Sequence, residues 1–248
     1  MSELHGDPMP TDSNPTEHYN TVVHAWGELL GQNLHYGFFE SANTDLATAT
    51  EALTSQMLAA AKLQPNMNVI DVGCGTGKAA CRMAEDFNAD VVGISPSSEC
   101  IDRANALTAT IEGGGSASFQ IGDGTKMAFE DESFDRVWVM ESSHLMQDKP
   151  ALLSECARVL RPGGKVVLCD IILKRKLPLE RVIEYRDEFL LLRDAFGRAI
   201  MEPLTFYAAT LESYGLHVEL VRDISEETFS TFAHWRNNAK KNRTQVIE

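Results

Sequence analysis

The segment from Val69 to Lys78 most constrains the fold, because an apolar run leads there directly into three closely spaced glycines. The run predicts a buried strand, and Gly73, Gly75 and Gly77 predict a turn that opens a helix. Glycines let a backbone approach a ligand closely, and the first turn of a helix presents unpaired N–H groups. The GxGxG spacing differs from the dinucleotide-binding GxGxxG, and a P-loop pattern is absent. The alternative is a turn that only packs the helix on the strand.

After this segment, short β-branched runs alternate with helical stretches, which is typical of βαβ units and a parallel sheet. We expect six strands, at Asn68–Val72, Asp90–Ile94, Ser116–Ile121, Asp135–Met140, Lys165–Ile172 and His217–Arg222. We expect helices between them at Gly77–Phe87, Ser98–Ala109, Pro150–Leu160 and Thr205–Tyr214, the third ending in the turn Arg161–Gly164. The predicted fold is therefore α/β, with a doubly wound, Rossmann-like sheet.

The chain divides into three predicted parts. Residues 1–16 are polar and proline-rich and predict a flexible arm, and residues 17–64 predict a helical cap with helices at His18–Leu30 and Asp45–Leu63. Residues 65–248 form the main domain. Within this domain, residues at about 174–200 interrupt the alternation of strands and helices. There the apolar side chains are spaced by three and four, which predicts an amphipathic helix after the fifth strand; they are Val182, Tyr185, Phe189, Leu192 and Phe196. We expect a lid over the site, with plain core packing as the alternative.

Composition excludes several partners. The net charge of −14 repels phosphate backbones and anionic membranes, so neither nucleic acid nor a membrane is an expected partner. The one basic run, Arg236–Arg243, predicts a solvated helix face. No apolar run approaches 18 residues and the N-terminus is polar, which argues against a membrane span and a signal peptide. Five scattered cysteines suggest neither a metal site nor disulfides, and fit a reducing cytoplasm.

Three motifs carry a family resemblance: DVGCGTG after the first strand, GDGTKMAFEDESFDRVWVMES, and RVLRPGGKVVLCD. Across residues 68–172 the chain resembles the class I S-adenosylmethionine-dependent methyltransferases. Trp26–Gly27 and Asn33–Phe38 resemble the small-molecule branch, which includes ubiquinone, tocopherol and antibiotic-sugar methyltransferases. The resemblance implies S-adenosylmethionine as cofactor and methyl transfer to a small, partly apolar metabolite. The alternatives are a non-methylating enzyme such as a cyclase, or a non-catalytic cofactor-binding module.

The resemblance also implies residue roles in cofactor binding. The turn backbone would lie against the methionine moiety, with Asp71 orienting the turn, and Asp123 would take the adenine amino group. The residues concerned come from the glycine turn, the turn after the third strand, and the aromatic N-terminal segment: Asp71, Gly73, Cys74, Gly75, Asp123, Gly124, Met127, Tyr19, His35 and Tyr36. For Tyr19 and Tyr36 the alternative is packing under an N-terminal helix.

The sequence departs from the family pattern after the second strand. Many members hold the ribose hydroxyls with an acidic residue at that strand's end, whereas this chain has Ser95 to Cys100. Cys100 stands where the antibiotic-sugar branch usually has glutamine. We expect Glu99 or Ser95 to hold the ribose, the alternative for Glu99 being a solvated residue in a first helical turn.

The chemistry needs a positioned acceptor and, for a hydroxyl or carbon nucleophile, a proton acceptor. His144 follows the fourth strand and has the titration range of a general base, and Asp170 follows the fifth and would fix its tautomer. Related sugar O-methyltransferases place histidine and aspartate at these positions. The alternative is a partly buried His144 satisfied by a backbone carbonyl. Glu141 is expected to be structural or to lie on the cofactor side, and whether oxygen, nitrogen or carbon is methylated stays open.

After Arg222 the pattern turns helical, at Glu226–Lys240, with no evident seventh strand. An unpaired sheet edge invites association. We therefore expect that the C-terminal helix shields the edge or that a second subunit covers it in a homodimer.

Overall fold

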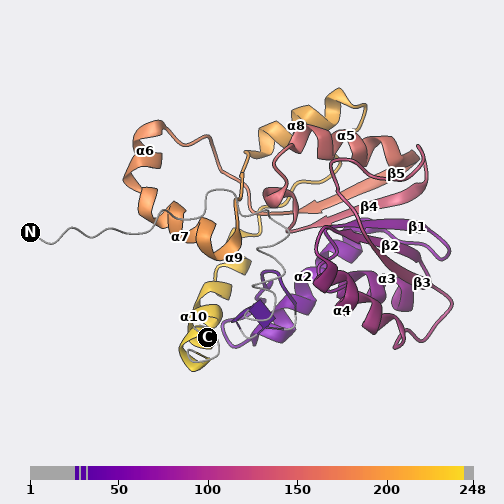
Figure 1. Cartoon of the computed structure of the whole chain (residues 1–248), viewed down its shortest axis with the longest axis horizontal. Coiled ribbons are helices and arrows are strands. Elements are labelled where there is room, and N and C mark those ends of the chain that lie inside the picture. The colour runs from indigo at the N-terminus through magenta and orange to yellow at the C-terminus, as the bar shows by residue number, and fades with distance from the viewer. Residues whose placement is uncertain (1–25, 28, 32, 243–248) are drawn as a thin grey trace, which may run out of the picture.

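The computed structural model describes residues 26–27, 29–31 and 33–242, and its centre is a sheet of five parallel strands (Figure 1). The strands are β1 (Asn68–Val72), β2 (Asp90–Ser95), β3 (Ser116–Ile121), β4 (Phe134–Met140) and β5 (Leu160–Cys169). Their order is β3-β2-β1-β4-β5. The order reverses between β1 and β4, so this is the switch point where ligands bind in open α/β sheets. The predicted fold class is confirmed.

Helices cover both faces of the sheet because alternate strand residues point to opposite sides. Val69 of β1 packs in a core shared with α2 (Leu46–Ala61), α3 (Lys78–Phe87) and α4 (Ser98–Thr108). Its neighbour Ile70 packs in a second core shared with α5 (Lys149–Val159). Figure 1 shows α5 and α8 (Leu204–Ser213) on that second side. The helices predicted from 45–63, 77–87, 98–109, 150–160 and 205–214 are thus confirmed to within a few residues.

The predicted strand at His217–Arg222 is wrong. Residues 216–224 form no ladder, and three of their apolar side chains are exposed: Val218, Leu220 and Val221. β-branched composition favours a strand only where a neighbouring edge offers hydrogen bonds and burial. Here side chains tether the segment instead, since Glu219 pairs with Lys165 of β5 and Arg222 donates to Gln56 of α2 at 2.8 Å.

The fifth strand begins earlier than predicted. Phe134 pairs with Leu160 and Arg136 with Lys165, so the predicted turn Arg161–Gly164 is a bulge inside β5. Gly163 allows it with a φ of +79°. The strand ends at Cys169, which brings Asp170 to the carboxyl edge of the sheet.

The insertion after β5 forms two helices, α6 (Leu179–Glu184) and α7 (Arg186–Phe196), which meet at Tyr185 where one helix was predicted. Figure 1 shows them projecting away from the sheet. Their described side chains are all at least partly exposed, and Leu179 and Leu191 are 72% and 70% exposed. Core packing is therefore excluded for these side chains, and closure as a lid stays a prediction.

The C-terminal segment forms α9 (Ser225–Thr228) and α10 (Thr231–Lys241) instead of one helix. α10 packs against the N-terminal segment: Trp235 lies 4.8 Å from the Tyr36 ring, and the Gly37 N–H donates to Thr231 Oγ1 at 3.0 Å. The expectation that this helix shields the β5 edge is therefore wrong. The predicted arm 1–16 and most of the helix predicted at His18–Leu30 lie outside the described residues. Among the residues that the structure describes, no helix is long and apolar enough to cross a bilayer.

Candidate active site

A cavity of about 440 Å³ lies at the carboxyl ends of β1, β2 and β4. The glycine turn, Asn33–His35 and side chains of α2 contribute to its walls. Predicted site residues that line it are Asp71, Gly73, Cys74, Gly75, Ser95, Cys100, His35 and Glu141. The sheet's switch point therefore brings half of the predicted residues together.

The glycine turn has a backbone shape that favours glycine. Gly73 and Gly75 have φ values of +81° and +51°, and a Cβ on Gly73 would lie 2.4 Å from Ser142 Cβ. The Gly73 and Cys74 N–H groups both donate to Ile94 O, at 2.9 and 3.0 Å, which fixes the turn on β2. A Cβ on Gly75 would meet no atom within 4 Å, so its missing side chain leaves room in the cavity.

Asp71, which is buried, and His35, which is partly buried, both line this cavity. Burial raises the pKa of Asp71 to about 7, because the carboxylate loses hydration. Burial lowers the pKa of His35 to about 4, so its ring is neutral at neutral pH. The His35 Nδ1–H donates to Tyr36 O at 2.8 Å, which fixes the ring's tautomer. The cavity thus presents a neutral imidazole and a carboxyl whose ionised form a bound cation would stabilise.

Glu141 ties the N-terminal segment to the sheet. The Tyr36 N–H donates to both of its carboxyl oxygens at 3.1 Å, across 105 residues. Burial, followed by the nearby Asp170, raises the Glu141 pKa well above its ordinary value. The Tyr36 ring packs against Phe232 and Trp235 of α10, a C-terminal helix and not the N-terminal helix of the packing alternative. Tyr19 lies outside the described residues.

Four other predicted cofactor residues do not line the cavity: Glu99, Asp123, Gly124 and Met127. Glu99 pairs with Arg103 at 2.8 Å along α4. Asp123 is exposed, and its Oδ1 accepts from the Thr125 N–H at 2.8 Å, which closes the turn after β3. Gly124 packs so tightly that a Cβ would lie 2.6 Å from Val72 Cγ1, and Met127 belongs to the second core.

His144 and Asp170 form a close pair where β4 and β5 end. His144 lies in the short 3-10 helix η1 (Ser143–Leu145), and its Nδ1–H donates to Asp170 Oδ1 at 2.5 Å. The Asp170 side chain is fully buried and the His144 side chain is 12% exposed. A carboxylate partner excludes the alternative of a backbone carbonyl. Since Asp170 only accepts, Nε2 carries the lone pair of the neutral ring.

Asp170 is held by more donors than sequence reasoning found. The His144 and Ile171 N–H groups donate to it at 3.0 and 2.7 Å, and Ser143 Oγ donates as well. Ser143 Oγ is also 2.9 Å from Tyr207 OH of α8. Ser143 adjoins His144 in the sequence and could have been considered, whereas Tyr207 gives no local signal.

Two other residues of the site were missed. Lys149 is 2% exposed, and its Nζ donates to Met146 O at 3.1 Å. Burial lowers the pKa of Lys149, while the negative charges of Asp170 and Glu202 act to raise it. Trp138 of β4 lines the cavity, and its buried Nε1 has no hydrogen-bond partner among the described residues. A central strand residue such as Trp138 reads as ordinary core in the sequence.

The site fits S-adenosylmethionine in shape and charge. The glycine turn provides room for a close ligand, and the buried Asp71 carboxyl matches the positive charges that this cofactor carries.

Comparisons with known proteins agree with this fit. The methyltransferase domain family matches residues 70–168. The 27-O-demethylrifamycin SV methyltransferase of Amycolatopsis mediterranei (strain S699) is 32% identical over 96% of this chain and 86% of its own length. The probable chloroplastic tocopherol O-methyltransferase of Oryza sativa subsp. japonica is 29% identical over 89% of this chain and 61% of its own length.

Solved structures support the fold alone, since their identities are low. Mycolic acid cyclopropane synthase CmaA1, complexed with SAH and CTAB, has a TM-score of 0.82 at 22% identity, covering 94% of this chain and 84% of that chain. The [4+2]-cyclase SpnF has a TM-score of 0.77 at 22% identity, covering 91% and 80%. Together with the matched domain and the rifamycin relative, the site shows that this chain belongs to the class I S-adenosylmethionine-dependent methyltransferases that act on small molecules.

Proposed function

We propose that this enzyme methylates a hydroxyl group of a small, partly apolar metabolite, with His144 as general base and Asp170 as its positioning partner. The observation that carries the proposal is the 2.5 Å contact between His144 Nδ1 and Asp170 Oδ1. A hydroxyl must lose a proton on methylation, and a base fixed in one tautomer serves that need. Several relatives are named O-methyltransferases, which supports oxygen as the acceptor atom.

Bound S-adenosylmethionine supplies a methyl group that its sulfonium already activates. In the proposed reaction the acceptor oxygen forms a bond to the methyl carbon while the carbon–sulfur bond breaks, and its electron pair stays on sulfur. His144 Nε2 takes the hydroxyl proton, and Asp170 stabilises the imidazolium that forms. S-adenosylhomocysteine and the methyl ether are released.

The cofactor roles remain part of this proposal. Asp71 and the glycine turn would hold the methionine moiety, Ser95 and Cys100 would face the ribose, and Asp123, Gly124 and Met127 would face the adenine. The cavity lining supports the first two groups. To reach Asp123, Gly124 and Met127, the bound ligand would have to extend beyond the cavity lining toward the turn after β3. To reach Glu99, it would have to extend toward the start of α4.

The test compares His144→Ala with His217→Ala, a histidine on the exposed segment after α8. Using methyl-labelled cofactor and a panel of hydroxylated metabolites, we expect turnover to fall about 100- to 10,000-fold in the first variant and to persist in the second. Calorimetry should show nearly unchanged cofactor affinity in both. Unchanged turnover of His144→Ala on a true acceptor would contradict the base assignment, and cofactor binding without any turnover of the native enzyme would favour a non-catalytic module.

Further proposals concern organisation. We propose a helical cap at 17–64 on a methyltransferase domain at 65–248, and a homodimer that covers the outer edge of β5, which carries no strand beyond it among residues 26–242. Sedimentation at high concentration tests the dimer, and a monomeric mass would exclude it.

The net charge of −14 supports the absence of nucleic acid as a partner. The five cysteines, none of which forms a disulfide, support a cytoplasmic location.

A further inference from the structure

Glu141 lies at the carboxyl edge of the sheet, between the two parts of the site. It follows β4 directly, and β4 lies between β1 and β5 in the sheet. The glycine turn follows β1, whereas Asp170 follows β5. The Glu141 N–H donates to Cys169 O at 2.8 Å, which holds Glu141 beside the end of β5. Glu141 therefore lies between the glycine turn and the His144–Asp170 pair.

Glu141 is partly buried and lines the cofactor cavity. The nearby residues Ser142 and Leu145 line it as well, so the cavity reaches the segment that carries His144. The Glu141 backbone has a φ of +47°, which is uncommon for any residue other than glycine. Such strained residues gather at functional sites, so a strained residue in a ligand cavity indicates a role for its side chain.

The Glu141 carboxylate has few partners. Among the described residues, the Tyr36 N–H is the one donor to its oxygens, and it lies 3.1 Å from both. A carboxylate offers about four acceptor positions, so most of them are free for a ligand. The charge that acts on Glu141 is that of Asp170, which is also negative and which, after burial, raises the Glu141 pKa. A cation beside Glu141 would relieve this repulsion and stabilise its ionised form.

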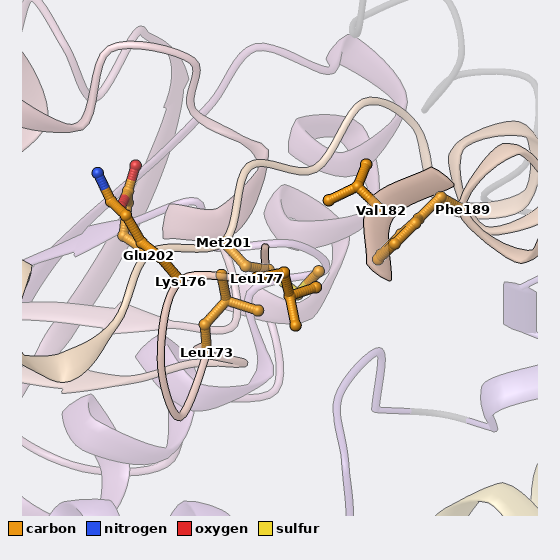
Figure 2. A pocket seen from close by; sticks show the side chains of 7 residues that line it. All are labelled: Leu173, Lys176, Leu177, Val182, Phe189, Met201 and Glu202. Atoms are coloured by element: carbon orange, nitrogen blue, oxygen red, sulfur yellow. The ribbon is translucent and has the colours of Figure 1, made fainter. Parts of the chain in front are cut away.

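The carboxylate in the protein's other cavity is arranged differently. That cavity, of about 330 Å³, lies at the base of the α6–α7 insertion, and both Glu202 and Lys176 line it (Figure 2). In Figure 2 these two side chains extend to the same side of the cavity, so an ammonium group accompanies the carboxylate there. In the part of the chain that the structure describes, Glu141 forms no ion pair. Its uncompensated charge belongs to the cofactor cavity.

Methyl transfer removes a positive charge from that cavity. S-adenosylmethionine carries a sulfonium cation, whereas the sulfur of S-adenosylhomocysteine is neutral because it keeps the electron pair of the broken carbon–sulfur bond. The sulfonium methyl must face the acceptor at the His144–Asp170 pair, and Glu141 lies on that side of the cavity. We propose that the Glu141 carboxylate recognises the sulfonium charge and thereby distinguishes the cofactor from its product. The inference rests on the proposed function, which places the acceptor at the pair.

The proposed role concerns binding and exchange of the cofactor. The positive charge on sulfur decreases as the methyl group leaves, so its attraction to Glu141 is stronger before the reaction than in the transition state. Such an interaction does not accelerate the chemical step. It lowers the relative affinity for S-adenosylhomocysteine, which favours replacement of the product by fresh cofactor.

The experiment measures ligand binding by calorimetry without an acceptor, at pH 8, where Asp71 is mostly ionised. The ligands are S-adenosylmethionine, S-adenosylhomocysteine and sinefungin, in which an amine-bearing carbon replaces the methylated sulfur. Glu141→Gln keeps the side-chain size and one oxygen that can accept the Tyr36 N–H. We expect this variant to lose about tenfold in affinity for the two charged ligands, and less than about threefold for S-adenosylhomocysteine.

Three further variants separate this effect from other causes. Glu85→Gln removes an exposed carboxylate that lines the same cavity, and it should keep the native ratio of affinities. Asp71→Asn should weaken binding of all three ligands alike, because each carries the α-ammonium group of the methionine moiety. His144→Ala should keep the native ratio, so a failed base assignment leaves this measurement intact. Thermal melting checks that each variant is folded.

An equal loss for charged and neutral ligands in Glu141→Gln would overturn the proposal and assign Glu141 only to holding Tyr36. Unchanged affinities in that variant, or the same change of ratio in Glu85→Gln, would overturn it as well. The native enzyme gives a test that needs no variant, since it should bind sinefungin more tightly than S-adenosylhomocysteine. The opposite order would contradict recognition of the charge.

Discussion

Tyr207 OH lies 2.9 Å from Ser143 Oγ, which in turn donates to Asp170. Through this contact α8 reaches the carboxylate that orients His144, although Tyr207 itself is 64 residues from Ser143 in sequence. Because the Ser143 hydroxyl has a single proton and gives it to Asp170, the Tyr207 hydroxyl donates to Ser143 Oγ and favours that orientation.

We expect Tyr207→Phe to lower turnover about 2- to 10-fold, the effect of one lost hydrogen bond, with cofactor affinity unchanged. The matched control is Tyr214→Phe, the same substitution at the exposed end of α8, where the hydroxyl lies 3.4 Å from Pro150 O. Steady-state kinetics and calorimetry make the comparison. If Tyr207 acts through Asp170, its effect should shrink in an Asp170→Asn background, and full additivity would contradict the link.

A second prediction concerns pH and Asp71. Burial raises its pKa to about 7, so below pH 7 the empty site holds a protonated carboxyl, and a cationic cofactor must displace that proton. Affinity for S-adenosylmethionine should therefore rise by up to about tenfold per pH unit from about pH 5.5 to about 7 and then level off.

Calorimetry at several pH values checks this slope. Asp71→Asn should bind more weakly at pH 7 with a flat profile, while Asp102→Asn on the exposed face of α4 should retain the native slope. The raised pKa of Asp71 also affects the free energy of unfolding. Because the native state holds the Asp71 proton more tightly than the unfolded chain does, the contribution of Asp71 to stability decreases as pH rises from about 4 to about 7. An Asp71→Asn profile as steep as the native one would assign the proton to another group.

The glycine turn allows a third test. Gly75 and Gly163 both have positive φ values, and a Cβ at either position would meet no atom within 4 Å, but only Gly75 lines the cofactor cavity. Valine at either position strains the backbone to a similar degree. We expect Gly75→Val to abolish measurable binding of S-adenosylmethionine and S-adenosylhomocysteine, and Gly163→Val to lower only the melting temperature. Equal affinity in the two variants would show that the turn does not hold the cofactor.

The sequence predicted the parts of this molecule that local chemistry decides. The strand, turn and helix around Gly73 follow from neighbouring residues, and the His144–Asp170 contact follows from parallel strands that end at one edge. The segment 217–222 has strand composition, but it forms no backbone ladder and only side chains tether it to β5, so the local pattern misled. Tyr207 and Trp235 act through contacts that only the folded chain creates.

The last prediction follows from such a long-range contact, the one between α10 and the segment that bears His35. Thr231 is fully buried, and its Oγ1 accepts the Gly37 N–H at 3.0 Å. Thr231→Val keeps the shape but leaves that N–H buried without an acceptor, which costs about 1–3 kcal/mol. We expect a lower melting temperature and weaker cofactor binding, because the neighbouring residues Asn33–His35 form a cavity wall. Thr228→Val, which alters a hydroxyl bonded only within α9 to Ser225 O, is the control and should bind the cofactor as the native protein does. Native affinity in Thr231→Val would show that the cavity wall holds its position without α10.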